Sequence, residues 1–219
     1  MKDGRAHPFD DPVLVAGYEA WYETAGRMPE LAERDLLGRL VADLADTRDA
    51  VEIGSGTGHW ARWLSGLGWR VVGVDLSEPM VAEAARRGGA WFVRADAHAL
   101  PFDNNAFDVA LAITTLEFLP HPVPALREAA RVARRGIVLG VLNRWHPLAW
   151  QRKRSRSPLW QAAHFYSPFE LTRLLRSALG ASIVGIGWRT TLVPGLAPRR
   201  HAHLPFGAFI GMRVILSRW

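Results

Sequence analysis

A short glycine-rich stretch, Gly54-Ser55-Gly56-Thr57-Gly58, follows an apolar run and precedes an amphipathic segment. Glycine at every second position lets the backbone turn tightly and lets a ligand approach the amides without meeting Cβ atoms. A dinucleotide-binding loop would carry another glycine three residues after the second one, where this chain has His59. The spacing therefore favours a nucleoside ligand without phosphates over a pyrophosphate.

Carboxylates accompany this loop at three places. Glu52 stands two residues before the first glycine, where a negative charge would repel a pyrophosphate but favour a cationic ligand. Asp75 ends the next apolar run, about 20 residues beyond the loop, where a carboxylate can accept both ribose hydroxyls. Asp96-Ala97 follows the third run and offers an acceptor and an amide suited to an adenine edge. Together these residues predict a positively charged nucleoside ligand.

Each feature also has a purely structural interpretation. The glycine loop could be a tight connection without a ligand, and Asp75 could cap the following helix. Asp96 could order the turn before Leu100-Pro101-Phe102. The coincidence of the loop with the acids favours ligand binding.

The elements that would position these residues alternate short apolar runs with amphipathic segments, which is typical of an α/β sheet built from crossover units. Apolar, β-branched runs without strict alternation indicate parallel strands covered on both faces. Such strands are expected near residues 49–54, 70–75, 90–95, 107–113 and 136–142. Two more, near 182–188 and 207–216, should form a hairpin-like antiparallel edge.

Helices are expected between the strands. One apolar stripe at helical spacing comprises Trp60, Trp63, Leu64 and Leu67. A second helix begins at Ser77-Glu78-Pro79 and runs to Gly88-Gly89, a third covers about 123–134, and residues 13–45 form two helices separated by Gly26 and Pro29.

The last expected helix has the strongest start signal. Ser167-Pro168-Phe169-Glu170 is a capping box with proline at the first helical position. Its predicted buried face consists of Leu171, Leu174, Leu175, Ala178 and Leu179.

Length and composition fit one domain of 219 residues without stabilising metals or disulfides. Cysteine is absent, which excludes a disulfide framework, a thiolate nucleophile and a thiolate metal site. The amino terminus lacks the apolar core of a signal peptide, and no apolar run approaches the ~20 residues of a membrane span. We therefore expect a soluble, cytoplasmic protein with no metal site.

Charge is unevenly distributed. Residues 1–142 carry 15 basic and 20 acidic side chains, whereas 143–219 carry 12 basic and one acidic, Glu170. The densest basic run is 151–156, QRKRSR. Such a field attracts an anionic substrate, a membrane surface or nucleic acid, although a solvated arginine-rich surface is the simpler interpretation and the one we favour.

Four blocks occur in order: VEIGSGTG, GVDLSEPM, RADAHALPFDNNAFDVALA and ALREAARVARRGIVLGVLN. Together they resemble the class I S-adenosylmethionine-dependent methyltransferases, in particular the small-molecule group related to ubiquinone and menaquinone methylases. The resemblance covers roughly residues 48–143. It implies S-adenosylmethionine as cofactor and an α/β, Rossmann-like fold, with a seven-stranded, mostly parallel sheet, an antiparallel last strand and helices on both faces.

The resemblance also implies cofactor contacts. The loop with Gly54, Ser55 and Gly56 packs on the methionine part, and Asp75 holds the ribose. Further implied contacts are Leu76 and Met80 beside the adenine, Asp96 and Ala97 at its polar edge, and Ile113 and Thr114 at the end of the fourth strand. Tyr18, Trp21 and Tyr22 in GYEAWYET resemble an aromatic segment that closes over the cofactor.

Two departures from the family pattern concern the acceptor. Relatives often read H-H-L-x-D-P after the fourth strand, where this chain has EFLPHP at 117–122, and the usual P-G-G turn is reduced to Arg134-Arg135-Gly136. Transfer from a sulfonium requires alignment and exclusion of water but no obligatory catalytic side chain. Candidate bases, each with a structural interpretation as well, are Glu117, His121, His146, His164 and Tyr166, so the catalytic residues stay unassigned.

We therefore expect methyl transfer to a small-molecule acceptor, apolar or aromatic and anionic, that enters under an irregular insertion at 144–166. Trp145, Trp150 and Trp160 could line that pocket or merely pack the insertion, whereas Trp60 and Trp63 belong to the core. In one domain, 1–47 would be an N-terminal helical segment, 48–143 the cofactor-binding core, 144–166 a lid, and 167–219 the C-terminal helix and strand pair.

Three other functions compete with this one. An RNA-modifying methyltransferase would use the basic C-terminal part on phosphates, although no recognition module accompanies it and a nucleic-acid partner is not expected. A non-catalytic S-adenosylmethionine-binding protein would keep the nucleoside site alone. A nicotinamide oxidoreductase is disfavoured by His59 and Glu52.

Overall fold

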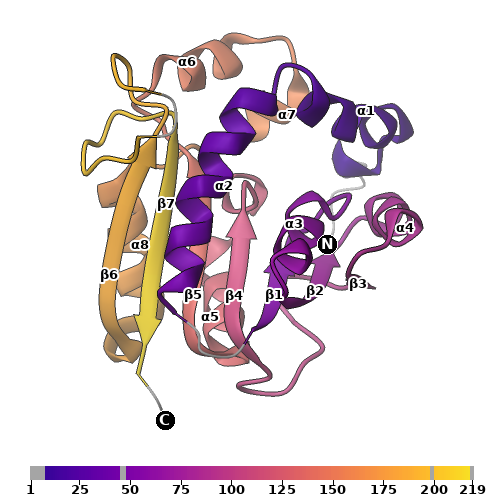
Figure 1. The fold of residues 1–219 in the computed structure, drawn as a ribbon, viewed down its shortest axis with the longest axis vertical. Helices are drawn as coiled ribbons and strands as arrows, with labels where there is room; N and C mark the ends of the chain where they lie inside the picture. The colour runs from indigo at the N-terminus through magenta and orange to yellow at the C-terminus, as the bar shows by residue number, and fades with distance from the viewer. Residues whose placement is uncertain (1–7, 45–47, 198–199, 218–219) are drawn as a thin grey trace.

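A seven-stranded sheet forms the centre of the molecule in a computed structural model, which describes residues 8–44, 48–197 and 200–217 (Figure 1). The strand order is β3-β2-β1-β4-β5-β7-β6. The strands are β1 (Asp49–Ile53), β2 (Arg70–Asp75), β3 (Trp91–Arg94), β4 (Phe107–Ile113), β5 (Ala133–Leu142), β6 (Ile183–Thr191) and β7 (Phe209–Leu216). The first five are parallel, and β7 lies antiparallel between β5 and β6. The expected mostly parallel sheet with an antiparallel last strand is confirmed.

Helices cover both faces of the sheet. The α-helices are α1 (Pro12–Glu23), α2 (Arg27–Ala42), α3 (His59–Gly66), α4 (Glu78–Arg87), α5 (Pro122–Val132), α6 (Pro147–Arg154), α7 (Pro158–Ala162) and α8 (Pro168–Leu179). Short 3-10 turns are η1 (Pro8–Asp10), η2 (Leu116–Phe118) and η3 (Gly180–Ser182). Apolar residues of α2 and α3 share one core cluster, and those of α5 and α8 share the other.

Local signals start several helices as expected. Ser77 accepts a hydrogen bond from the amide of Met80 at the start of α4, with proline in the first turn. Ser167 and Glu170 make the complete capping box of α8. Both caps satisfy backbone amides that lack intrahelical partners, so sequence alone suffices to place these helix starts.

Three sequence expectations were wrong at element boundaries. α5 ends at Val132 rather than near 134, because Ala133 pairs with Phe107 of β4 and begins β5. Leu67 caps the end of α3 and is 47% exposed, because Gly68 turns away with a φ of 85°. Pro29 does not separate α1 from α2 but lies in the first turn of α2, where a missing amide hydrogen removes no helical bond.

The insertion at 144–166 is not irregular, since it contains α6 and α7. In each of these helices a residue in extended conformation, His146 or Ser157, precedes a proline at the first helical position. This pattern is a helix-start signal that the sequence carried. Within the described ranges, none of the helices combines the length and apolarity needed to cross a bilayer.

Candidate functional site

The loop after β1 has the backbone conformation that its glycines predict. The φ angles of Gly54, Gly56 and Gly58 are 71°, 53° and 81°. A Cβ at Gly54 would lie 2.3 Å from Thr115 Cγ2, and one at Gly58 would lie 2.4 Å from the Phe92 ring. Glycine is therefore required by both conformation and space.

Asp75 ties this loop to the start of α4. Its Oδ2 accepts a hydrogen bond from the amide of Gly56 at 2.8 Å, and its Oδ1 accepts one from the amide of Ser77 at 2.9 Å. Each carboxylate oxygen can accept more than one hydrogen bond. The group is thus held in place by the backbone and keeps accepting capacity for a ligand's hydroxyls.

Glu52 lies on β1 directly before the loop and is almost fully buried. Burial raises the pKa of this carboxyl well above its usual value, and nearby Asp75 adds to the effect, while the Ala61 amide and Arg62 oppose it. Neither carboxyl oxygen makes a hydrogen bond of standard geometry with the residues that the structure describes, although the Ala61 amide is close enough to favour the charged form. Without a ligand this carboxyl therefore favours its neutral form, and an approaching cation would favour its ionisation.

Ser55 adds a third buried polar atom of this kind. Its Oγ also lacks a hydrogen-bond partner within the described part of the chain. Buried polar groups in proteins are nearly always hydrogen-bonded, so such atoms in and beside a loop with glycine at every second position mark a place for a ligand. An ammonium or sulfonium group fits the donor set, because Glu52 would ionise beside it and Ser55 can donate or accept.

The end of β4 meets the loop from the other side. Thr115 Oγ1 donates to the carbonyl of Ile53 at 3.0 Å, and the Thr114 amide donates to the carbonyl of Gly140 at 2.7 Å. Thr114 has a φ of 51°, an unusual conformation for a β-branched residue and one often found at functional sites. Ile113 is buried beneath it.

The residues expected around an adenine lie beyond β2 and β3. Leu76 is exposed, whereas Met80 is completely buried in this conformation. Asp96 is exposed and its Oδ1 lies 2.9 Å from the His98 amide and 2.6 Å from its Nδ1. Partial burial opposes ionisation, but these contacts with His98 outweigh it and lower the pKa of Asp96. Ala97 beside it is half-buried.

All of these positions lie at one edge of the sheet. β3, β2, β1 and β4 are consecutive parallel strands, so their carboxyl ends are adjacent. The structure therefore brings the glycine loop, the acids and Thr114 together as sequence order alone could not, at the edge where such folds bind ligands.

Helix α1 covers the loop from above. Tyr18 lies against Gly56, with its Cε1 3.9 Å from where a Cβ would stand, and burial raises its pKa to about 12. Tyr22 stacks on His59, with ring centroids 3.6 Å apart and planes inclined by 7°. Trp21 contacts the edge of Tyr22, with ring centroids 5.1 Å apart, but it is exposed and packs against Gly26 rather than against the loop.

A polar cluster, made of Glu19, Glu30, Thr57, His59 and Arg62, fixes α1 in this position. Thr57 donates to Glu19 Oε1, and Arg62 Nη2 donates to the same oxygen at 2.7 Å. The His59 ring lies 3.4 Å from Glu19 Oε2 and 3.0 Å from Glu30 Oε1. His59, which replaces the third glycine of a dinucleotide loop, thus links the loop to α1 and α2.

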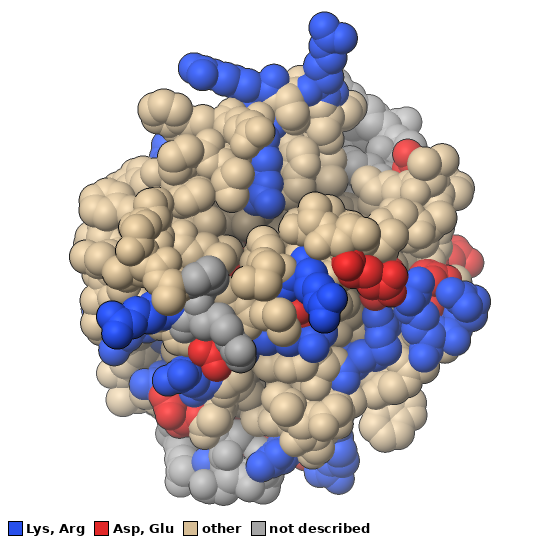
Figure 2. Space-filling view, turned by 45° about the horizontal axis from the view of Figure 1, so that its top comes forward, with Lys and Arg blue, Asp and Glu red and all other residues tan. Residues whose placement is uncertain are grey.

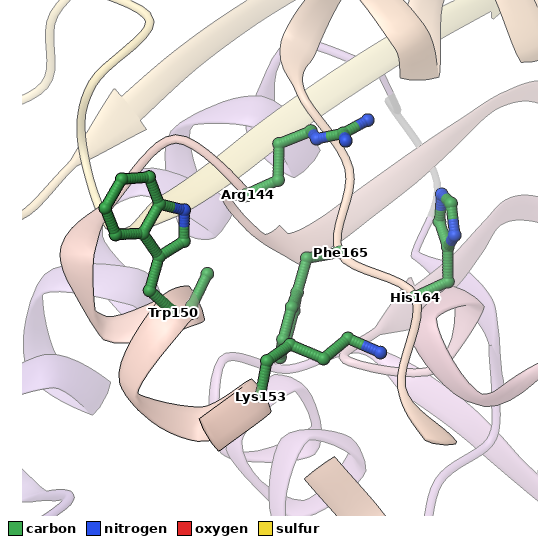
Figure 3. Close-up of a pocket in the computed structure, with 6 residues that line it drawn as sticks. Arg144, Trp150, Lys153, His164 and Phe165 are labelled. Atoms are coloured by element: carbon green, nitrogen blue, oxygen red, sulfur yellow. The ribbon is translucent and has the colours of Figure 1, made fainter. Parts of the chain in front are cut away.

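A cavity of about 210 Å³ lies under the insertion. Its lining residues are Arg144, Ala149, Trp150, Lys153, His164 and Phe165, which Figure 3 shows around the Phe165 ring. Lys153 Nζ lies 5.8 Å from the centre of that ring. Of the three tryptophans considered for an acceptor pocket, Trp150 is in this lining, whereas Trp145 contacts Phe169 and Trp160 contacts Phe118.

Glu117 differs from the other candidate bases. It is almost fully buried after β4, and its Oε1 accepts from the Leu142 amide at 2.6 Å, while Oε2 has no partner among the described residues. Burial raises its pKa to about 7, against a smaller opposing effect of Arg152. The other four candidates make structural contacts. The backbone carbonyl of His121 contacts His98, and His146 Nδ1 accepts from the Leu148 amide. His164 Nε2 contacts Glu170, and the Tyr166 hydroxyl donates to the Leu116 carbonyl.

Comparison with known proteins agrees with this geometry. The family model of a methyltransferase domain matches residues 51–140. A SAM-dependent methyltransferase from Thermotoga maritima, described as a possible histamine N-methyltransferase, has a TM-score of 0.77 and 29% sequence identity, covering 95% of this chain and 98% of that one. Residues 51–140 thus carry the pattern of a methyltransferase domain, and nearly the whole chain is similar to a SAM-dependent methyltransferase.

Curated relatives match more than half of this chain. Demethylmenaquinone methyltransferase of Roseiflexus castenholzii is 36% identical over 140 residues, which cover 60% of this chain and 54% of the relative. An uncharacterized protein of Methanocaldococcus jannaschii is 34% identical over 130 residues, 58% and 61% of the two chains. The chain thus spans less than two thirds of the length of these relatives.

Several contacts in and around the candidate site had no sequence signal. Glu19 meets His59 across 40 positions, and Arg144 reaches the cavity from the end of β5. Thr115, which packs on Gly54, could have been found from the paired threonines at the end of the fourth predicted strand. Long-range contacts of this kind depend on the packing of whole elements.

Proposed function

We propose that this chain transfers a methyl group from S-adenosylmethionine to a small-molecule acceptor. The observation that carries the proposal is the set of buried, unpartnered polar atoms of Glu52 and Ser55 beside the bare glycine loop. A ligand with a positive charge would satisfy them, whereas a pyrophosphate would be repelled by an ionised Glu52.

Each part of the cofactor has a set of residues that would hold it. Gly54, Ser55 and Gly56 would receive the methionine part, with Glu52 stabilising its positive charge, and Asp75 would accept the ribose hydroxyls. The remaining proposed contacts are Leu76, Met80, Asp96 and Ala97 for the adenine, Ile113 and Thr114 at the end of β4, and Tyr18 and Tyr22 as the cover. When bound, S-adenosylmethionine supplies a methyl group activated by a sulfonium.

The acceptor would occupy the cavity under α6 and α7. Trp150 and Phe165 offer apolar contact, and Arg144 and Lys153 offer positive charge, which suits an apolar or aromatic compound with an anionic group. Methyl transfer needs an aligned donor and acceptor and little water, so the insertion would have to close over the acceptor when it binds. A curated relative named for a quinone acceptor supports the small-molecule class.

Glu117 would take a proton where the acceptor has to lose one. Glu117 links the segment after β4 to the end of β5 and to the insertion. Its carboxyl accepts from the Leu142 amide, and its backbone carbonyl accepts from the His164 amide at 2.7 Å. A carboxyl with a pKa of about 7 is well matched to proton transfer near neutral pH.

Calorimetric titration with S-adenosylhomocysteine tests the cofactor assignment. We expect saturable binding that Asp75→Asn weakens, while Asp103→Asn, an exposed aspartate, leaves it unchanged. Absence of binding at millimolar ligand would remove the proposal.

Labelled methyl donor incubated with a fractionated cell extract tests the acceptor class. We expect label in a small, organic-soluble compound. Label in nuclease-sensitive material would instead support the RNA-modifying alternative. The exposed basic residues of α6 are the observation that favours this alternative. Tight cofactor binding without transfer to any fraction would support a non-catalytic binding protein.

A further inference from the structure

Six large apolar side chains gather at the end of the molecule that carries the insertion. They come from α6 and the residues before it, from the start of α8, and from the loop between β6 and β7. Their exposed fractions lie between 41% and 67%, and they are Trp145, Leu148, Trp150, Phe169, Leu204 and Phe206. We call this set the apolar patch.

Three rings of the patch contact one another across these elements. The Trp145 ring lies 5.6 Å from the Phe169 ring and 6.3 Å from the Phe206 ring, between centroids. Figure 1 shows α6 and the β6–β7 loop together at the top of the molecule, beyond the carboxyl end of β5. A grouped apolar surface of this kind marks an interaction site, whereas single exposed apolar residues do not.

Positive charge surrounds the patch. Exposed basic residues on the same elements are Arg144, Lys153, Arg154, Arg156 and Arg200. The one acid between 143 and 219 is Glu170, which is already paired at 2.8 Å with Arg144 and at 2.8 Å with His164. In Figure 2, which turns this end forward, blue side chains project from a largely uncharged upper surface, and most red atoms gather lower down.

We propose that the apolar patch binds the surface of an anionic membrane. Tryptophan prefers the boundary between lipid headgroups and acyl chains, leucine and phenylalanine insert into it, and arginine and lysine attract anionic headgroups. A single strand of RNA would use the aromatic rings for stacking but would gain little from Leu148 and Leu204. The mixture of aliphatic, aromatic and basic side chains therefore fits a lipid surface better.

The position of the cavity adds a consequence that rests on the proposed function. Trp150 belongs both to the patch and to the cavity lining. An acceptor dissolved in the membrane would thus reach the cavity without crossing water. Membrane binding itself requires neither cofactor nor methyl transfer, so it can be tested separately.

Vesicle sedimentation with the full chain tests the proposal. We expect binding to vesicles of phosphatidylglycerol and phosphatidylcholine in equal parts, little binding to phosphatidylcholine alone, and release by high salt. Arg154→Gln should lower the partition coefficient about fivefold, the effect of one basic residue near an anionic surface.

Two tryptophans with the same exposure provide a matched pair. Trp150 in the patch and Trp91 on β3 are each 67% exposed. Trp150→Gln should lower partitioning about tenfold through lost apolar insertion, whereas Trp91→Gln should leave it within about twofold. Phe206→Ser provides a second patch variant, and unchanged thermal unfolding midpoints show that each variant is folded.

Three results would overturn the proposal. They are failure to bind anionic vesicles at low salt, equal effects of the Trp150 and Trp91 variants, and binding of an RNA oligonucleotide without binding of vesicles. Loss of methyl transfer in solution with vesicle binding intact would contradict the proposed function instead.

Discussion

Two buried glutamates, Glu52 and Glu117, lie at or just beyond the carboxyl ends of neighbouring parallel strands, and each has a carboxyl oxygen without a donor in the described structure. Burial disfavours the charged form of both, so their ionisation depends on what approaches them. Glu52 faces the place proposed for a cation, and Glu117 faces the insertion. The same physical effect would thus serve cofactor binding in one case and proton transfer in the other.

Glu52→Gln is expected to weaken S-adenosylhomocysteine binding by about tenfold or more, the loss of a buried charge-assisted hydrogen bond. Because the carboxyl is protonated without ligand, binding should release about one proton, so affinity should rise with pH in the wild type and lose that dependence in the variant. Calorimetry in two buffers of different ionisation enthalpy measures the affinity and the number of protons released. Glu33→Gln, also a buried carboxyl with a raised pKa, is the control. Equal proton release in wild type and Glu52→Gln would contradict this role.

Glu117→Gln is expected to lower the rate of methyl transfer at least about 100-fold where the acceptor must lose a proton. A base must be deprotonated to act, so the wild-type rate should rise as pH passes about 7 and then level off. The variant should lose this rising limb but bind cofactor normally. A rate–pH profile measured with the identified acceptor tests this role. If the variant keeps the rising limb of the wild type, Glu117 is not the base.

Helix α1 is held on the glycine loop by ionic contacts rather than by apolar packing alone. Burial opposes ionisation of Glu19, but hydrogen bonds from His59, Thr57 and Arg62 outweigh it and lower its pKa to about 2. An ionised, multiply bonded carboxylate therefore fixes the helix that carries Tyr18. Release of these bonds is the simplest way for α1 to move and open the loop.

Glu19→Gln is expected to increase the dissociation rate of S-adenosylhomocysteine by about tenfold, since hydrogen bonds to a charged group are lost while the loop itself is unchanged. Stopped-flow measurement of the protein's tryptophan fluorescence gives the dissociation rate. Glu23→Gln on the same helix is the control, because Glu23 is exposed. Similar rates in both variants would show that the polar cluster does not restrain α1.

Burial of acids also affects the stability of the folded chain as a whole. Burial raises the pKa of Glu33 to about 8, with Arg152 opposing and Glu30 and Glu117 adding to the effect. In the unfolded chain this group ionises near its ordinary pKa of 4.5, so the unfolded state binds fewer protons between these values. The free energy of unfolding should therefore fall as pH rises from about 4.5 to about 8.

Glu33→Gln should make this fall shallower, because one of the groups that stays protonated in the folded state is removed. Urea denaturation at pH values across the window gives the free energy of unfolding of each protein. The exposed Glu23→Gln should retain the wild-type slope. A variant slope equal to that of the wild type would show that Glu33 ionises normally in the fold.

Much of the fold and part of the candidate site follow from short stretches of sequence. Positive φ at Gly54, Gly56 and Gly58, the Ser77 and Ser167 caps, and the apolar strands depend on residues within a few positions of one another. Prediction from sequence was wrong where contacts between distant elements competed with local preference. Ala133, for example, pairs with β4 instead of extending α5. The two helices of the insertion were missed although their serine or histidine and proline starts were present.

The sequence by itself determined which chemical groups follow each strand, and these groups predict the type of ligand, because the strands themselves and the loop conformation are encoded locally. Only the tertiary structure decided that burial raises the pKa of Glu52, that Glu19 and His59 hold α1 on the loop, and that Trp150 lines the cavity while Trp145 and Trp160 do not. The reason is that ionisation, long-range hydrogen bonds and exposure depend on which distant elements pack around a residue, and no local pattern specifies them.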